Sequence, residues 1–173
     1  MRRKLTWCVT CTATIVLAAL HFGGRVHASP AAGYVSTTMA QGRFGEIDVS
    51  NYFIPPDLNT ANVWLSWQKT KGMSDLYVQN NVWQPGGTTG WHTHPAASLI
   101  IVTAGTVTAY EGDDPNCTPT VYTQGMGFVD PGGGHVHILR NEGSVEARTI
   151  AVQLLPADSA RRVDVDDPGN CHF

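Results

Sequence analysis

Residues 86–98, GGTTGWHTHPAAS, place two histidines, His92 and His94, one residue apart and directly before a proline. In a strand, successive side chains alternate between two faces, so residues i and i+2 point the same way. The pair can therefore aim two imidazole rings at one point. A metal ion bound at about 2.0–2.2 Å needs several ring nitrogens that converge from a rigid frame, so a site here requires a partner elsewhere in the chain.

A second pair, His135 and His137, supplies that partner in the stretch GGGHVH. Of the five histidines beyond residue 28, only His172 lies outside the two pairs. Taken singly, each pair is equally well explained as a solvated strand end or as a glycine-rich turn with incidental histidines. Two such pairs in one small β domain favour a metal site.

The chain between and around these pairs has the pattern of an all-β protein. Short runs rich in Val, Ile, Thr and aromatic residues alternate with clusters of Gly, Pro, Asn and Asp, which predicts a sandwich or barrel. The predicted strands are residues 34–40, 76–83, 98–104, 106–111, 120–123, 126–130, 135–140 and 147–155. The tight connection at Gly105 predicts a hairpin between the third and fourth of these strands.

Residues 1–28 have the features of a cleaved signal peptide. A short basic segment precedes an apolar run, and the small-residue pattern VHA comes directly before Ser29. The apolar run is shorter than the roughly 20 residues of a membrane span, so an uncleaved anchor is the weaker alternative. We therefore expect export, to the periplasm, the cell envelope or the medium.

The remaining residues, 29–173, suffice for one domain with a substantial core. They carry 7 basic and 14 acidic side chains, a net charge of −7, and have no basic patch for nucleic acid or an anionic membrane. Cys117 and Cys171 form an even pair in an oxidising compartment, which predicts a disulfide that ties the C-terminal tail to a loop. Two free thiols or an intermolecular bridge are the alternatives.

The spacing around the first histidine pair resembles the first motif of the cupin family. That motif reads Gly, five residues, His-x-His, three or four residues, Glu, six residues, Gly. Counting from Gly86 through His92 and His94 to Gly105, every spacing fits, but Ser98 stands at the glutamate position.

The second histidine pair lies in a stretch that resembles the second cupin motif. Gly125 is followed by five residues and Pro131, and the ending His-x3-Asn is present at His137 and Asn141. One extra glycine stands between the proline and the histidine. The ending identifies His137 as the expected ligand, and His135 lies two residues before it.

The resemblance implies a single jelly-roll β-barrel with a metal near one mouth. On this basis we expect residues 29–75 to supply the N-terminal strands of the barrel, residues 76–155 to form the conserved barrel and residues 156–173 to form an acidic tail. Cupins often pair through their outer sheets, so a homodimer is also an expectation.

The missing glutamate leaves two arrangements open. In one, His92, His94 and His137 hold a divalent ion with open positions; in the other, His135 is a fourth ligand. Without a carboxylate, a full 2+ charge would remain and attract an anionic or enolic ligand that chelates through oxygen. The metal, whether iron, manganese, zinc, nickel or copper, is not determined by imidazole ligands.

Other side chains are candidates for the wall and chemistry of the pocket. Tyr110 and Glu111 are candidate proton donors or acceptors, and strand alternation lets only one of them face inward. The predicted lining residues are Trp83, Trp91, Ser98 and Phe128. Two functions follow: a small-molecule dioxygenase or isomerase that uses the metal, or a non-catalytic module that binds a metal or small ligand.

Overall fold

The computed structural model describes residues 29–54 and 63–173, so the predicted signal peptide lies outside the described residues. No helix occurs in the described ranges, and none of their segments could therefore cross a membrane as a helix. The strands are β1 (Ala32–Phe44), β2 (Asp48–Phe53), β3 (Trp64–Lys69), β4 (Ser74–Thr88), β5 (His92–Thr93), β6 (Ser98–Ala104), β7 (Thr106–Glu111), β8 (Thr120–Thr123), β9 (Gly127–Asp130), β10 (His137–Arg140), β11 (Ala147–Pro156) and β12 (Val163–Asp164). The predicted all-β barrel is confirmed.

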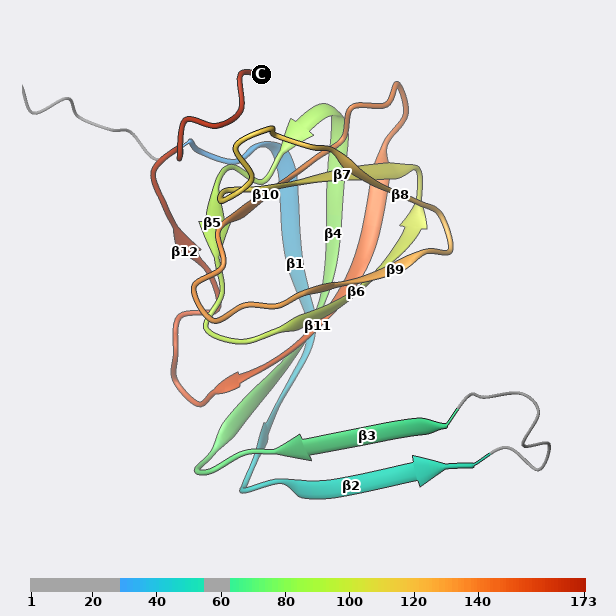
Figure 1. Cartoon of the computed structure of the whole chain (residues 1–173), viewed down its shortest axis with the longest axis vertical. Coiled ribbons are helices and arrows are strands. Elements are labelled where there is room, and N and C mark those ends of the chain that lie inside the picture. Colours follow the sequence, from blue (N-terminus) through green and yellow to red (C-terminus); the bar gives the residue numbers. More distant parts are fainter. Residues whose placement is uncertain (1–28, 55–62) are drawn as a thin grey trace, which may run out of the picture.

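Ten of these strands form one sheet that curves into a nearly closed barrel (Figure 1). One half has the order β1-β4-β11-β6-β9, and the other has the order β12-β5-β10-β7-β8. The halves join where Arg140 of β10 pairs with Thr88 at the end of β4. The two halves face each other, so side chains that alternate inward from both halves fill the interior.

The interior is apolar in one part and polar in another. Trp83 of β4 packs with Val107, Ala109, Leu139 and Ala147 in a buried cluster. Along β4 and β11, however, several inward positions on the same strand faces as Trp83 and Leu155 are polar and buried. These residues are Gln79, Asn81, Thr149 and Gln153. Buried polar groups require hydrogen-bond partners and are therefore uncommon in an apolar core. These inward polar side chains indicate a functional cavity in this part of the barrel.

The predicted hairpin at Gly105 is wrong. β6 pairs with β11 and β9, whereas β7 pairs with β10 and β8, so the two strands lie in opposite halves of the barrel. One residue between them is too short for a two-residue hairpin turn. Gly105 has φ +66° and passes so close to the start of β11 that a Cβ would lie 2.6 Å from the carbonyl oxygen of Glu146. The connection thus moves the chain across the barrel.

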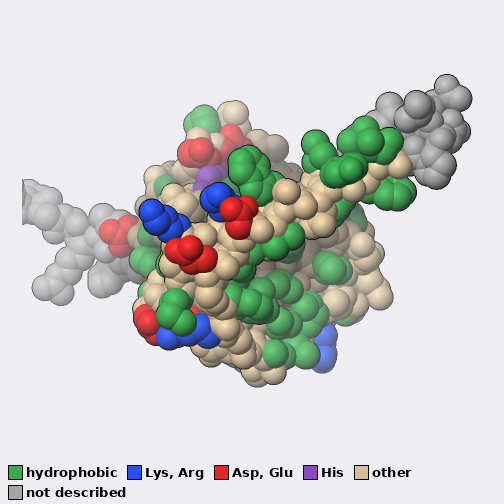
Figure 2. All heavy atoms as spheres, turned by 90° about the horizontal axis from the view of Figure 1, so that it is seen from below, with side chains coloured by type: hydrophobic (Ala, Val, Ile, Leu, Met, Phe, Trp, Pro, Cys, Tyr) green, Lys and Arg blue, Asp and Glu red, His purple; other side chains and the backbone are tan. Residues whose placement is uncertain are grey.

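Residues 29–75 do not all contribute to the barrel. β1 pairs with β4, but β2 and β3 form a two-stranded sheet of their own that projects from the barrel (Figure 1). Hydrophobic side chains cover this projecting hairpin in Figure 2. They include Tyr52, Leu65 and Trp67, each more than 70% exposed. The sequence pattern did not predict these two strands.

The C-terminal residues are part of the domain and not a free tail. β12 pairs with β5, beside the first histidine pair. Cys171 is buried and forms the expected disulfide with Cys117. The polar, acidic composition of this segment predicts a tail pinned by the disulfide, and its backbone also completes the sheet next to β5.

An ion pair between the buried Asp75 and the exposed Arg43 fastens β1 to β4 and gives a prediction for stability. Asp75 accepts two hydrogen bonds from Arg43, at 2.7 and 2.8 Å, and these lower its pKa from 3.8 to about 2. A carboxyl with a lowered folded-state pKa stabilises the fold above its unfolded pKa, and this stabilisation is lost as the pH falls toward 2. We expect Asp75→Asn to lower the melting temperature at pH 5–7, with the difference from wild type closing between pH 4 and 2.

The matched control for this prediction is Asp48→Asn. Asp48 pairs with Lys69 at 2.7 Å, but both side chains are more than 60% exposed, so this pair contributes little. Thermal unfolding of both variants at each pH is the measurement. A gap for Asp75→Asn that stays constant down to pH 2 would contradict the assignment.

Candidate functional site

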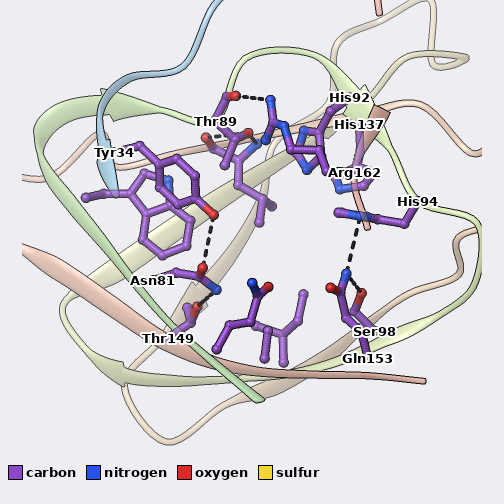
Figure 3. Close-up of a pocket in the computed structure, with 15 residues that line it drawn as sticks. Tyr34, Asn81, Thr89, His92, His94, Ser98, His137, Thr149, Gln153 and Arg162 are labelled. Carbon is purple, nitrogen blue, oxygen red and sulfur yellow. Dashed lines mark hydrogen bonds between the residues drawn. The ribbon is translucent and has the colours of Figure 1, made fainter. Parts of the chain in front are cut away.

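The two histidine pairs meet at one end of the barrel. His92 of β5 and His137 of β10 are direct cross-strand partners, and His94 comes directly after the end of β5. All three side chains are buried, and one ring nitrogen of each lies within 4.8 Å of the others. Figure 3 shows the three rings gathered on one side of a cavity. The rings that the sequence spacing predicted to converge are thus brought together.

The backbone fixes which nitrogen of each ring faces the cluster. The Nδ1 atoms of His92 and His94 lie 2.8 Å from the carbonyl oxygen of Gly90 and 2.7 Å from that of Arg161. Nδ1 of His137 lies 3.4 Å from the carbonyl oxygen of His135. Since a carbonyl only accepts, the short contacts of His92 and His94 favour the tautomer with the proton on Nδ1 and the lone pair on Nε2, and the longer contact of His137 favours it more weakly.

Burial also keeps the rings neutral. Desolvation lowers the pKa of His92 and of His94, and it lowers the pKa of His137 to about 4. Nearby positive charge adds to the effect at His92, whereas Asp130 opposes it at His137. Three neutral imidazoles with converging lone pairs are the protonation state that a metal ion requires.

The cavity beside the rings is small, and its wall is about as polar as it is apolar. It offers about 30 Å³ to water-sized molecules, room for about two of them. Its far wall holds a hydrogen-bonded chain in which Tyr34 donates to Asn81 at 3.0 Å and Asn81 donates to Thr149 at 3.2 Å (Figure 3). A larger ligand would have to displace part of the wall.

Ser98 lines this cavity, at the bottom of the histidine cluster. Its hydroxyl accepts a hydrogen bond from the Gln153 amide at 2.7 Å, and that amide nitrogen also lies 3.2 Å from Nδ1 of His94. The hydroxyl lies 3.4 Å from Oδ2 of Asp130, to which it donates. Ser98 therefore connects neighbouring groups and does not itself face the three Nε2 atoms as a charged ligand.

Asp130 brings a carboxylate close to two of the three rings. The carboxylate is buried, and its Oδ2 lies 3.4 Å from Nε2 of His94 and 3.7 Å from Nε2 of His137. Sequence spacing missed this residue because the family motif assigns no ligand to its position. The signal that could have found Asp130 is an acidic residue on a strand next to Ser98, because Ser98 stands where the motif has its carboxylate.

His135 does not lie within the cluster of the other three histidines. Its Nε2 is 3.4 Å from Oε2 of Glu111, and its side chain is 28% exposed. It forms a second group of possible ligands with Asp130 and His137. The i, i+2 rule fails here because β10 begins only at His137, and the preceding glycine-rich turn has no strand alternation.

The candidate proton donors point in different directions. Tyr110 packs with Trp91, Ile138 and Cys171 in a second buried cluster, away from the three histidines. Its hydroxyl donates to Glu142 at 2.8 Å, and burial with this bond raises its pKa to about 12. Glu111 faces the opposite way, beside His135, and desolvation raises its pKa.

The predicted lining residues are likewise divided. Trp83 lines the cavity and packs on Tyr34 with ring centroids 4.8 Å apart. Trp91 lies in the second cluster, and Phe128 stacks on Tyr122 in a neighbouring small cavity that also touches Asp130 and His135.

The C-terminal segment also supplies groups that the motifs did not indicate. Beside the carbonyl of Arg161, which holds His94, the side chain of Arg162 lines the cavity and donates to the carbonyl oxygen of Thr89 (Figure 3). Arg161 donates to Gln79 at 2.6 Å. No local pattern marks these arginines, because β12 reaches the site only through tertiary pairing.

The donor set fits a divalent transition metal. Three converging neutral imidazoles suit zinc, copper, iron or nickel, and a nearby carboxylate extends the range to manganese. The hydrogen bond from each Nδ1 to a carbonyl is the arrangement that orients metal-binding histidines in proteins.

Residues 82–153 match the family model of the cupin domain. The match includes all three clustered histidines and the whole of both motifs, residues 86–105 and 125–141. This part of the barrel is therefore a cupin domain. A comparison with curated proteins gave no match.

Several solved structures are similar to the chain. They include the cysteine peptidase peruvianin-I from Thevetia peruviana latex, with 26% identity, 53% of this chain and 56% of that chain covered, and a TM-score of 0.43. An oxalate oxidase in complex with the substrate analogue glycolate has 25% identity, covers 52% of this chain and 46% of its own, and has a TM-score of 0.43. A cupin domain from Bordetella pertussis has 18% identity and a TM-score of 0.40, and the match covers 64% of this chain and 93% of that chain. The chain spans about half the length of the first two.

Proposed function

We propose that this cupin domain binds one divalent transition metal through Nε2 of His92, His94 and His137, and that a small oxygen-bearing compound binds beside it. The observation that carries the proposal is the shared orientation of the three rings, each held by a backbone carbonyl at Nδ1. A bound metal of this kind supplies Lewis acidity and, if redox-active, electron transfer. The predicted export of the chain agrees with its disulfide.

The surrounding residues support a small ligand. The cavity is narrow, its far wall offers the Tyr34 hydroxyl and the Asn81 amide, and Arg162 contributes positive charge. These groups would orient a compound with several oxygen atoms and hold water out once it is bound. We infer a dioxygenase or isomerase activity on such a compound.

The first experiment is metal analysis of the untagged protein. After incubation with Fe²⁺, Mn²⁺, Zn²⁺, Ni²⁺ or Cu²⁺ and removal of free ions, we expect about one ion per chain for at least one metal. His172→Ala is the matched control, because His172 is exposed and lies outside the cluster. A wild-type protein that retains none of these metals would overturn the proposal.

Turnover separates the enzyme from the alternative, a non-catalytic binding module. Oxygen uptake is measured with the iron-loaded protein on small thiols, diketones and phenols, and isomerisation is followed by NMR. Turnover that is lost in His92→Ala supports an enzyme. Stoichiometric metal binding without turnover for any loaded metal would favour the binding module.

A further inference from the structure

We infer that Asp130 is the carboxylate ligand of this metal site and takes the place of the glutamate that is absent at residue 98. The inference rests on the proposed function, since it assigns a fourth protein ligand to the same ion. The site is then three histidines and one aspartate, with the aspartate supplied by a different strand from the one that the family motif uses.

Strand register puts the carboxylate next to the missing position. Ser98 of β6 and Asp130 of β9 are direct partners in an antiparallel pair. Directly opposite residues project to the same face with Cβ atoms about 4.5–5.5 Å apart. A side chain from residue 130 therefore enters the space that a side chain from residue 98 would occupy, and the two side chains touch at 3.4 Å.

The distances match ligands that share one ion. Two donors bound at about 2.1 Å lie about 3.0 Å apart at a right angle and about 4.2 Å apart on opposite sides of the ion. Oδ2 of Asp130 lies 3.4 Å from Nε2 of His94 and 3.7 Å from Nε2 of His137, within this range for two of the three histidines. The same two nitrogens are ones with free lone pairs. The donor atoms that lie within 4.8 Å of one another are those of the three histidines without Asp130, so the carboxylate must move toward His92 for all four to bind one ion.

Hydrogen bonds leave Oδ2 pointing at the rings. Oδ1 accepts the backbone N–H of Gly132 at 2.9 Å, as in a turn closed by an aspartate side chain. Gly132 has φ +64°, and a Cβ there would lie 2.3 Å from the carbonyl oxygen of Ala96, so only glycine lets the loop approach this closely. The loop thus holds Oδ1, whereas Oδ2 accepts the long 3.4 Å hydrogen bond from Ser98 and lies beside the rings.

The buried charge of Asp130 also calls for a cation. Its side chain is 3% exposed, and in residues 29–54 and 63–173 the only basic side chains within 4.0 Å of its carboxylate are those of His94 and His137, whose rings burial keeps neutral. A buried carboxylate without a positive partner is costly. A divalent ion held by the histidines would provide the positive charge, and the net charge at the site would fall from 2+ to 1+.

The variant Asp130→Asn separates coordination from loop structure. Asparagine can keep the hydrogen bond from Gly132 but removes the negative charge. We expect its Zn²⁺ affinity, measured by chelator competition, to fall by at least about 100-fold, because even partners one step removed from the metal contribute about 10–100-fold. His172→Ala is the control and should keep wild-type affinity, because His172 is exposed and lies outside both groups of possible ligands.

An exchange of the two positions provides the complementary test. In the double variant Ser98→Glu, Asp130→Ser, the carboxylate returns to the motif position. We expect this double variant to bind Zn²⁺ more tightly than the single variant Asp130→Ser. The inference is overturned if the added glutamate gives no gain in Zn²⁺ affinity and His135→Ala loses as much Zn²⁺ affinity as Asp130→Asn. Asp130 would then belong to the neighbouring group of possible ligands with His135.

A spectroscopic measurement on the wild-type protein does not depend on whether a variant folds. Infrared difference spectra of wild type with and without Zn²⁺, recorded with ¹³C-labelled aspartate side chains, should show a shifted aspartate carboxylate band. If Zn²⁺ binds and no aspartate band moves, or if Asp130→Asn keeps wild-type affinity, the inference fails while the three-histidine site stands. If wild type binds no metal, the proposed function itself fails.

Discussion

Replacing His137 with alanine lowers the affinity for a divalent metal by more than about 100-fold, because a direct ligand contributes more than the outer partners, which account for about 10–100-fold. His137 lies at the centre of the site. It is the cross-strand partner of His92 and the histidine shared by both groups of possible ligands. Competition with a zinc-binding dye measures the change.

Folding must be separated from ligation in this experiment. His137 is buried, so alanine leaves a small cavity, whereas His137→Gln keeps most of the volume without an imidazole. We expect both variants to lose metal binding and His172→Ala to retain it. Wild-type affinity in a folded His137→Gln protein would show that the ring is not a ligand.

The disulfide gives the second large effect, through the C-terminal segment. Cys117 and Cys171 are 54 residues apart in the sequence, and a closed loop of this length stabilises a fold by about 4 kcal/mol through the entropy of the unfolded chain. The double variant Cys117→Ser, Cys171→Ser is therefore expected to lose about this much free energy of unfolding in urea.

The same variant should weaken the metal site. The segment between β11 and Cys171 provides the carbonyl of Arg161 that orients His94, and β12 holds it against β5. Release of the segment removes this partner from His94, so we expect metal affinity to fall by about 10-fold or more. Wild type treated with a reductant is the control and should behave alike. A loss of stability below about 1 kcal/mol would show that the remaining contacts anchor the segment.

The sequence by itself determined the fold class and the three histidines. Strands such as residues 98–104 and 106–111 were predicted with their observed bounds, because β-forming runs end at local turn residues. The convergence of His92 and His94 also follows from short spacing, since Thr93 is the only residue between them. Such features depend on neighbours in the chain and are therefore readable from it.

Only the tertiary structure decided which strands are partners and what completes the site. Gly105 joins strands in opposite halves of the barrel, and Asp130 reaches the histidines because β9 lies against β6. Arg161 lies 67 residues from His94, whose ring its carbonyl holds. Pairing between distant strands is set by the closure of the whole sheet, so the carboxylate and the outer partners of the histidines could not be read from local spacing.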